Sequence, residues 1–136
     1  MHRYSLVLCF TATALYATGC HKADVKDYVP AEQAARTALG AALDAWKSGK
    51  SPDQIGASNP AVNAEDPQWR GGKKLADYEI IGPAPGEDQN QRFAVKLTLA
   101  GEAAPKETTY IVVGKDPLWV FSADSYRQTS GVTTGM

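Results

Sequence analysis

Apolar positions follow a helical period in the part of the chain that begins near residue 30. They recur at intervals of four, four and three residues, at Ala35, Leu39, Leu43 and Trp46, which places them on one face of a helix. Pro30 suits the start of a helix, and Gly49 suits the position just after its end. The pattern predicts a helix over about Ala31 to Ser48, with many alanines that favour close approach to a flat partner such as a sheet.

The next stretch predicts a helical turn and then a loop. Ser51 can cap a turn that has Pro52 at its first position, and Gln54 can close a capping box. Asn59-Pro60 ends this turn. We expect residues 61–73 to form a loop that holds Trp69 and the pair Gly71-Gly72.

From residue 75 the period changes to two, which is typical of half-buried strands. Four strands are predicted, over Leu75–Ile81, Arg92–Leu99, Glu107–Val113 and Leu118–Phe121. In the first, one face carries Ala76, Tyr78 and Ile80. The second has the cleanest alternation, with its apolar face made by Phe93, Val95, Leu97 and Leu99. Polar residues dominate from Ser125 onward, where we expect a flexible tail over 125–136.

Helices followed by sequential strands with short connections predict an α+β domain with an antiparallel meander. We expect one long N-terminal helix plus a short helix, packed on a curved antiparallel sheet of three to four sequential strands. The sheet would bury its Phe93, Val95 and Leu97 face against the apolar stripe of the long helix. This arrangement resembles the cystatin-like and NTF2-like architectures.

The first twenty residues have the organisation of an export signal. Arg3 gives a positive charge, Leu6 to Tyr16 is an apolar run, and small residues lead to Cys20. Ala17-Thr18-Gly19-Cys20 is similar to a bacterial lipobox, which implies a lipoprotein that carries acyl chains such as palmitate on Cys20. Ala17 stands where that pattern prefers leucine, and Ala17-x-Gly19 also fits ordinary secretory cleavage. Lipidation and plain secretion with a free thiol are therefore both open.

These features divide the chain into a signal peptide over 1–19, a lipid-anchored tether over 20–29 and one domain over 30–124. Anchoring would hold the protein in the bacterial envelope outside the cytoplasm, on the periplasmic or the outer face. A single acyl chain binds a bilayer weakly, whereas two or more anchor stably.

Composition narrows the chemistry. The formal net charge is −1, and no basic stripe of the kind that nucleic acid requires is present. After the predicted cleavage the domain has no cysteine, and its only histidine is His21, beside the anchor. These counts argue against thiol or Ser-His-Asp catalysis and against a zinc site. We expect no catalytic residues, no metal and no cofactor.

A second resemblance lies in the later part of the chain. The residues Asp66, Trp69, Gly72, Leu75, Tyr78 and Glu79 form a D-x-x-W-x-x-G-x-x-L-x-x-Y-E pattern, and Asp116-Pro117-Leu118-Trp119-Val120 follows later. The set is similar to a group of uncharacterised exported bacterial proteins, often lipoproteins. That resemblance implies an α+β domain of the envelope and transfers no catalytic residue.

The residues of this pattern, together with Trp46 and Tyr110, are expected to have structural roles. Trp69 is expected to anchor its loop on the edge of the domain, and Gly71 or Gly72 to adopt a positive φ. Asp66 before Pro67 is expected to start a turn. Tyr78 and Tyr110 are expected to be half-buried, with their hydroxyl groups at the rim of the sheet. Trp46 is expected in the core.

Three classes of function are compatible with the sequence. The first is a lipid-anchored binding domain, with Cys20 as the lipidation site, that contacts an envelope protein, a peptide or another ligand through Trp69, Trp119 or Tyr110. The second is an enzyme that uses carboxylates and tyrosines such as Asp77, Tyr78, Tyr110 and Asp124. The third is a structural subunit of an envelope complex. We favour the first, without nucleic acid as a partner.

Overall fold

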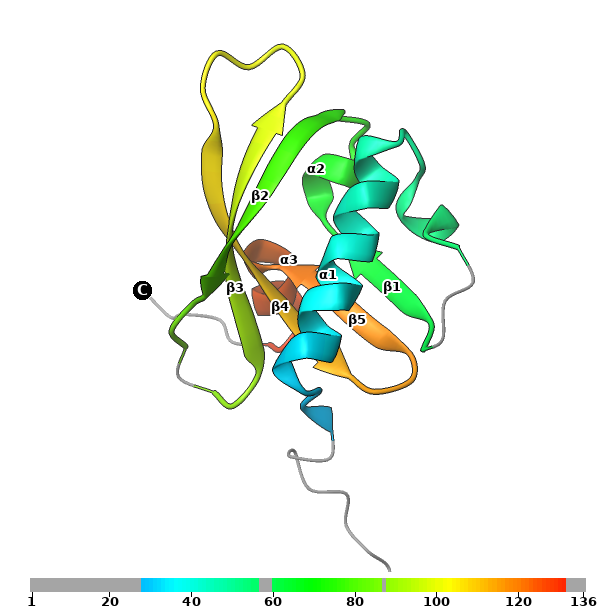
Figure 1. Ribbon diagram of the computed structural model, residues 1–136, viewed down its shortest axis with the longest axis vertical. Coiled ribbons are helices and arrows are strands. Elements are labelled where there is room, and N and C mark those ends of the chain that lie inside the picture. Colours follow the sequence, from blue (N-terminus) through cyan, green and yellow to red (C-terminus); the bar gives the residue numbers. More distant parts are fainter. Residues whose placement is uncertain (1–27, 57–59, 87, 132–136) are drawn as a thin grey trace, which may run out of the picture.

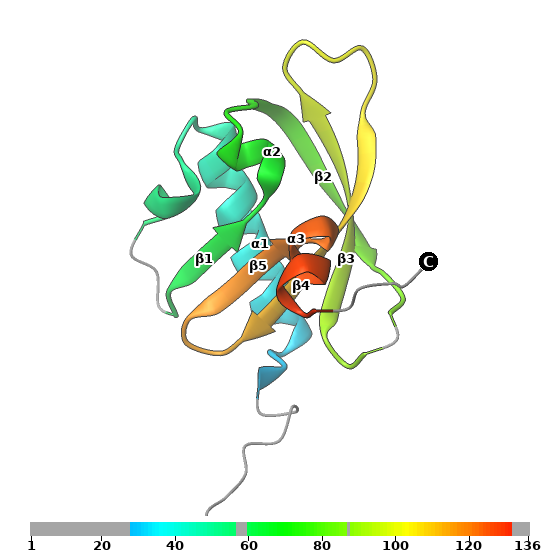
Figure 2. The same cartoon turned by 180° about the vertical axis from the view of Figure 1, so that it is seen from behind.

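The computed structural model describes residues 28–56, 60–86 and 88–131. Within them the chain forms a five-stranded mixed sheet with a long helix, α1, on one face and a short helix, α3, on the other (Figures 1 and 2). The strand order is β1-β5-β4-β3-β2. The α+β class is therefore as predicted, while five strands replace the expected three to four. Of the helices described, none is both long and apolar enough to cross a membrane.

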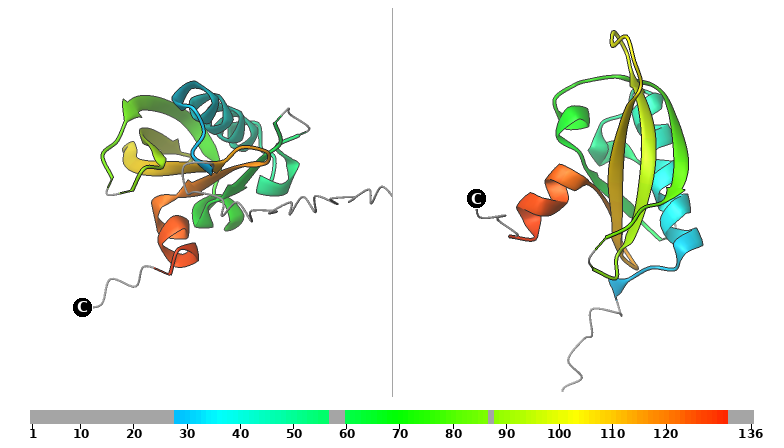
Figure 3. Two further views of the ribbon diagram at one scale, coloured as in Figure 1. Left: turned by 90° about the horizontal axis from the view of Figure 1, so that it is seen from below. Right: turned by 90° about the vertical axis from the view of Figure 1, so that its left-hand side faces the viewer.

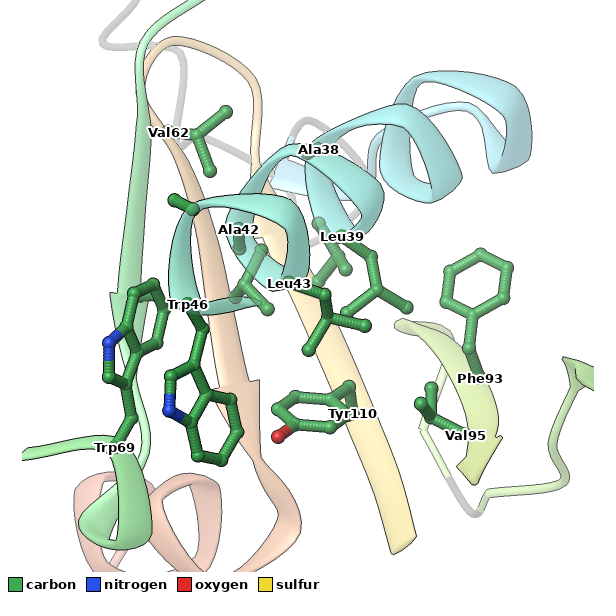
Figure 4. Packing of buried hydrophobic residues seen from close by; sticks show 14 of the residues in the cluster. Ala38, Leu39, Ala42, Leu43, Trp46, Val62, Trp69, Phe93, Val95 and Tyr110 are labelled. Atoms are coloured by element: carbon green, nitrogen blue, oxygen red, sulfur yellow. The ribbon is translucent and has the colours of Figure 1, made fainter. Parts of the chain in front are cut away.

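Helix α1 spans Glu32–Lys47, within one residue of the predicted helix at each end. Its apolar stripe is buried as predicted: Ala35, Leu39, Leu43 and Trp46 are each at most 2% exposed. Alanines flank these residues on the buried side, which lets the helix axis come close to the sheet. Figure 4 shows Leu39 and Leu43 pointing from α1 towards the side chains of the sheet.

The antiparallel meander contains the four predicted strands: β2 (Leu75–Pro83), β3 (Gln91–Leu99), β4 (Lys106–Gly114) and β5 (Leu118–Ser122). The alternation predicted for β3 is confirmed, because Phe93, Val95, Leu97 and Leu99 are all buried in the core cluster with the α1 stripe. On β2, Tyr78 and Ile80 pack against this cluster as predicted. The prediction for Ala76 is wrong: the pairing of β2 with β3 shifts between Leu75 and Asp77, and Ala76 is exposed.

Strand β1 (Val62–Glu65) was not predicted, because residues 61–73 were interpreted as a loop. It pairs in parallel with β5, Val62 opposite Leu118 and Ala64 opposite Val120. Val62 and Ala64 are buried under α1. Four residues are too few for a periodicity to be recognised, and the strand exists because β5 supplies its hydrogen-bonding partner.

The same predicted loop contains helix α2 (Pro67–Arg70), which follows β1 directly. Asp66 caps it: Asp66 Oδ1 accepts hydrogen bonds from the backbone N–H groups of Gln68 at 2.8 Å and Trp69 at 3.3 Å. The turn expected at Asp66-Pro67 is thus the start of a short helix. The turn at η2 (Pro52–Gln54) agrees with its prediction, and the Ser51 N–H donates to Gln54 Oε1 at 3.1 Å.

Helix α3 (Ala123–Thr129) corrects the prediction of a flexible tail from residue 125. It lies on the side of the sheet opposite α1 (Figure 3). Tyr126 packs edge-on against Phe121 at 6.0 Å, and the Arg92 guanidinium lies 5.4 Å from the Tyr126 ring centroid. Those tertiary contacts stabilise a polar helix that has no apolar period of its own. Residues 132–136 of the predicted tail lie outside the described residues.

Candidate functional site

Two corners with a similar local sequence and the same backbone turn face each other at one end of α1. The first is Trp46-Lys47-Ser48-Gly49-Lys50, after α1, and the second is Trp69-Arg70-Gly71-Gly72-Lys73, after α2. We call them the first and the second corner. In each, the glycine before the last lysine has a left-handed φ, +83° at Gly49 and +86° at Gly72.

The backbone hydrogen bonds of the two corners match as well. Gly49 N donates to Trp46 O at 2.9 Å and Lys50 N to Ala45 O at 3.0 Å. In the second corner, Gly72 N donates to Trp69 O and Lys73 N to Gln68 O, both at 3.1 Å. This is the Schellman arrangement, in which a residue with positive φ closes a helix and satisfies its last carbonyl groups. The positive φ expected of Gly71 or Gly72 is thus found at Gly72.

The two corners are locked together by their tryptophans. Trp46 Nε1 donates to the carbonyl oxygen of Lys73, and Trp69 Nε1 donates to that of Lys50, each at 2.7 Å. Their rings stack with centroids 5.5 Å apart and an interplanar angle of 11° (Figure 4). Each corner therefore fixes the backbone of the lysine that ends the other corner. Both tryptophans are buried, so the anchoring role expected of Trp69 and the core position expected of Trp46 are confirmed.

A pocket of about 500 Å³ lies over this tryptophan pair, and we call it the corner pocket. Its lining comes from both corners and from the residues that follow each of them, with the buried tryptophans at its base. Four of the lining side chains are cationic and only one, Asp53, is a carboxylate; the cations are Lys50, Arg70, Lys73 and Lys74. Although the whole chain is nearly neutral, this pocket has a clear positive charge.

Some of these cations are already neutralised by neighbours. Arg70 donates to both carboxylate oxygens of Glu65, at 2.8 and 2.6 Å. The Glu65 hydrogen bond, together with the charges of Glu65 and Asp53, raises the Arg70 pKa further. Lys73 Nζ lies 3.3 Å from Glu102 Oε1. Lys50 and Lys74 form no ion pair with any described residue, so their charges are available to a ligand.

A buried tyrosine–aspartate pair supports the second corner from beneath. Tyr110 Oη donates to Asp66 Oδ2 at 2.5 Å, while Oδ1 of the same carboxylate caps α2. Tyr110 is 2% exposed, so the expectation of a half-buried ring with its hydroxyl group at the rim is wrong. Burial, followed by the charge and the hydrogen bond of Asp66, raises the Tyr110 pKa well above its usual value. The hydroxyl group stays protonated and serves as a fixed donor.

The residues named for an acid–base enzyme do not meet in one site. Asp77 lies on β2, and its Oδ1 accepts a hydrogen bond from Lys47 Nζ at 3.2 Å. This hydrogen bond lowers the Asp77 pKa. Tyr78 Oη donates to Asp44 at 2.6 Å, and burial followed by the Asp44 hydrogen bond raises the Tyr78 pKa to about 12. Asp124 pairs with Arg127 on α3, and of the four named residues only Asp124 and Tyr110 share a pocket, which has a volume of about 50 Å³. That volume is far below the ~300 Å³ or more that small-molecule sites offer.

Trp119 lies on the opposite face of the sheet from the corner pocket. Its ring stacks on Phe121 at 5.7 Å, and with Glu65, Val113 and Thr129 the two rings line an open hollow of about 400 Å³. The three predicted contact residues are therefore separated: Trp69 under the corner pocket, Tyr110 in the core and Trp119 behind the sheet. Cys20, the predicted lipidation site, lies outside the described residues.

An apolar groove of about 460 Å³ runs along the N-terminal half of α1. It is lined mainly by alanines of α1 and by Pro60, Val62 and Leu118. Among the described residues, no charged side chain lines this groove. For this reason the corner pocket is the better candidate for recognition.

Sequence reasoning identified Trp69 and the glycines but missed the lysines and the partnership with Trp46. The signal was present as two copies of a W-[KR]-[SG]-G-K string, 23 residues apart. Each copy has the glycine that a Schellman turn requires, followed by a lysine. Within the described residues, no group of three or more His, Cys, Asp or Glu side chains is arranged to hold a metal ion.

Fold and site together define a small α+β domain with an open, cationic pocket above a buried pair of tryptophans. Comparison with protein-family models, with curated proteins and with solved structures found no match for this chain. The function must therefore be argued from the pocket itself.

Proposed function

We propose that the protein is a lipid-anchored binding domain of the bacterial envelope that holds an anionic ligand in the corner pocket. The observation that carries this proposal is the excess of cations over carboxylates in the lining, with Lys50 and Lys74 unpaired among the described residues. Unpaired lysines with fixed backbones attract an anion without first having to break an ion pair.

A purely structural role at helix ends explains only some of the lysines. Cations near the C-terminus of a helix stabilise its dipole, which would explain Lys47 and Lys50 at the end of α1. It does not explain Lys74, which lies two residues beyond the turn that ends α2, a helix of only four residues. The last carbonyl groups of α1 are moreover already satisfied, by the Ser48 hydroxyl group and by the N–H groups of the first corner.

The remaining parts of the proposal come from the sequence. Ala17-Thr18-Gly19-Cys20 supports lipidation of Cys20, with residues 20–29 as the tether. The D-x-x-W-x-x-G-x-x-L-x-x-Y-E pattern supports membership of a group of exported lipoproteins. The long helix against four antiparallel strands supports a cystatin-like or NTF2-like relationship, from which the parallel strand β1 departs.

Binding can be measured with the tryptophans of the pocket itself. Two of the three tryptophans lie at its base, so a Trp119→Phe background leaves only Trp46 and Trp69 to report. Titration of the Cys20→Ala, Trp119→Phe chain with inorganic pyrophosphate should give a saturable change in fluorescence that weakens with added salt.

The matched variants test whether the pocket lysines are responsible. The double variant Lys50→Gln, Lys74→Gln should weaken pyrophosphate binding about tenfold. Each exposed charge is expected to contribute a few tenths to about 1 kcal/mol of binding free energy, and about 1.4 kcal/mol corresponds to a factor of ten. Lys106→Gln with Lys115→Gln removes the same charge from exposed positions outside the pocket and should leave the affinity unchanged. Equal weakening in both pairs would show non-specific attraction and would contradict the proposal.

The anchor is tested separately, by intact mass and membrane fractionation of the native chain beside Cys20→Ala. A lipid-sized mass increment and membrane retention, both lost in the variant, are expected. A soluble, unmodified wild type would mean that Ala17-x-Gly19 directs ordinary secretory cleavage.

A further inference from the structure

Arg70 is the pocket cation whose orientation is fixed by two hydrogen bonds. It is the last residue of α2, and Glu65 is the last residue of β1, so the tight connection between these elements brings the two side chains together. Arg70 Nε donates to Glu65 Oε2 at 2.8 Å, and Arg70 Nη2 donates to Glu65 Oε1 at 2.6 Å. Two parallel hydrogen bonds to one carboxylate hold the plane of a guanidinium in a single orientation.

The other side of the same guanidinium is open. The pair with Glu65 uses Nε and one N–H of Nη2, which leaves Nη1 and the outer N–H of Nη2. Among the described residues, no acceptor is hydrogen-bonded to these groups. Asp53 Oδ1 lies 3.6 Å from Nη2, too far for a hydrogen bond, and the Asp53 side chain is 78% exposed. The open side of Arg70 thus has only a loosely placed, hydrated counter-ion.

The two carboxylates near Arg70 lie on different sides of it. Asp53 lines the corner pocket, whereas Glu65 lines the hollow around Trp119. A ligand that enters the corner pocket therefore meets Asp53 and the open side of the guanidinium. Glu65 holds the guanidinium from the far side and does not occupy the position of the ligand.

The chemistry of this open side selects a shape as well as a charge. Nη1 and Nη2 lie side by side in one plane and form a fork that matches the two oxygen atoms of a carboxylate or phosphoryl group. An ammonium ion is a compact point charge with rotatable donors, so it attracts any anion. In the corner pocket, Lys50 and Lys74 provide general attraction, and Arg70 provides a fixed geometry.

We infer that Arg70 recognises the anion through Nη1 and Nη2, that Glu65 positions this fork, and that the ligand presents a carboxylate or phosphoryl group that takes the place of Asp53. This inference rests on the proposed function and names the chemical class of its ligand. It makes Arg70 the residue that determines specificity and Glu65 a positioning residue.

The fork is tested by Arg70→Lys in the Cys20→Ala chain, with isothermal titration calorimetry. This variant keeps the charge and loses the fork, so it should bind inorganic pyrophosphate about tenfold more weakly. Its affinity for hexacyanocobaltate, an anion of comparable charge without paired oxygen atoms, should be unchanged. Arg36→Lys makes the same substitution at an exposed position outside the pocket and should change neither affinity.

The two carboxylates give a second test in which Arg70 stays in place. If charge alone mattered, replacing either carboxylate by an amide would strengthen pyrophosphate binding. Asp53→Asn should do so, about twofold. Glu65→Gln should instead weaken binding about threefold, because an amide has one acceptor oxygen for the two N–H groups and the fork loses its preorganisation. In the Arg70→Lys chain, which has no fork to orient, Glu65→Gln should strengthen binding.

The opposite results have separate meanings. Arg70→Lys that binds pyrophosphate as tightly as the parent chain, or that loses affinity for both anions equally, would overturn the inference and leave the proposed anion site intact. Glu65→Gln that strengthens binding as Asp53→Asn does would overturn the positioning role. Absence of pyrophosphate binding in the parent chain would overturn the proposed function itself.

Discussion

The two corners have the same sequence pattern and the same backbone turn, yet they are built on very different supports. The first corner ends a helix of 16 residues that buries seven side chains, whereas the second ends a helix of four residues that buries only Trp69. Each is also held by a tyrosine–aspartate pair. The pair at the first corner, Tyr78 with Asp44, is partly exposed, and the pair at the second, Tyr110 with Asp66, is buried.

This difference shows that a local motif fixes the turn but not the stability of the element that carries it. In both places the turn consists of a glycine with positive φ and the backbone N–H of the next residue, which donates back to the helix. The long helix is stabilised by its own apolar face against the sheet. The short one exists because a cap, a buried tyrosine and the opposite tryptophan all hold it, so its stability comes from residues distant in the sequence.

The largest expected effect comes from removing one tryptophan of the stacked pair. Trp46→Ala and Trp69→Ala should each lower the free energy of unfolding by about 3–5 kcal/mol, because each creates a cavity and leaves a lysine carbonyl without its donor. The loss in the double variant should be smaller than the sum of the two single losses, since both single variants remove the same stacking contact. Urea denaturation of the four chains gives these values.

The two tryptophan variants should differ in where the structure is lost. In Trp46→Ala, α1 stays packed on the sheet through Leu39 and Leu43, so no single element is released. Hydrogen exchange should therefore rise throughout the molecule, as the global stability falls. Trp69→Ala removes the one buried side chain of α2, and exchange should rise most over residues 67–74. A uniform rise in both variants would show that the corners are equally supported, contrary to the comparison.

The second prediction concerns the carboxylate that begins the second corner. Asp66→Ala removes both the cap of α2 and the acceptor of Tyr110, and should destabilise the protein by about 2–4 kcal/mol. Tyr110→Phe leaves the buried carboxylate with one donor fewer and should cost about 1–3 kcal/mol. Asp44→Ala at the first corner is the matched control, and should cost less than about 1 kcal/mol because its hydrogen bond is exposed.

Thermal unfolding compares the loss of stability in the two aspartate variants directly. If Asp66→Ala and Asp44→Ala shift the transition equally, the buried pair has no special role. Asp66→Asn keeps an acceptor and a capping group, so it should recover most of the stability lost in Asp66→Ala.

The first corner was predictable from the sequence as the end of a helix. The second was predictable only in separate features, namely the anchor Trp69, a positive φ at Gly71 or Gly72 and a turn at Asp66-Pro67. Trp46 ends a periodic stretch long enough to reveal its own helix, and the strands after residue 75 alternate clearly. Strand β1 and α2 have four residues each, too few for any period. The bond from Tyr110 to Asp66 joins residues 44 positions apart and has no local signal. The lysines were overlooked because their role depends on the two corners meeting in space.

The third prediction tests whether the two turns, which have nearly the same glycine φ angle, lose the same stability when a side chain is added. Gly49→Ala and Gly72→Ala should each destabilise the protein by about 1–2 kcal/mol, because a side chain disfavours positive φ, while no atom lies within 4 Å of the added Cβ. Similar losses would confirm that strain alone is responsible. Gly40→Ala, within α1 and also free of contacts, should instead stabilise by up to about 1 kcal/mol.

The smallest expected effect is the loss of stability at high pH, which compares the two tyrosines. A tyrosine whose pKa is raised by folding stabilises the protein fully below its unfolded pKa of about 10, and this contribution falls as pH rises through the folded value. From pH 10 to 11 each such tyrosine should lower the free energy of unfolding by up to about 1.4 kcal/mol.

Tyr110→Phe should therefore flatten the fall in stability, measured by urea denaturation at pH 9, 10 and 11. Tyr78, with a pKa of about 12, responds over the same range but lies closer to solvent, so Tyr78→Phe should flatten the fall less. An unchanged slope in Tyr110→Phe would mean that the buried pair opens before it titrates, and that the second corner is less firmly held than its hydrogen bonds indicate.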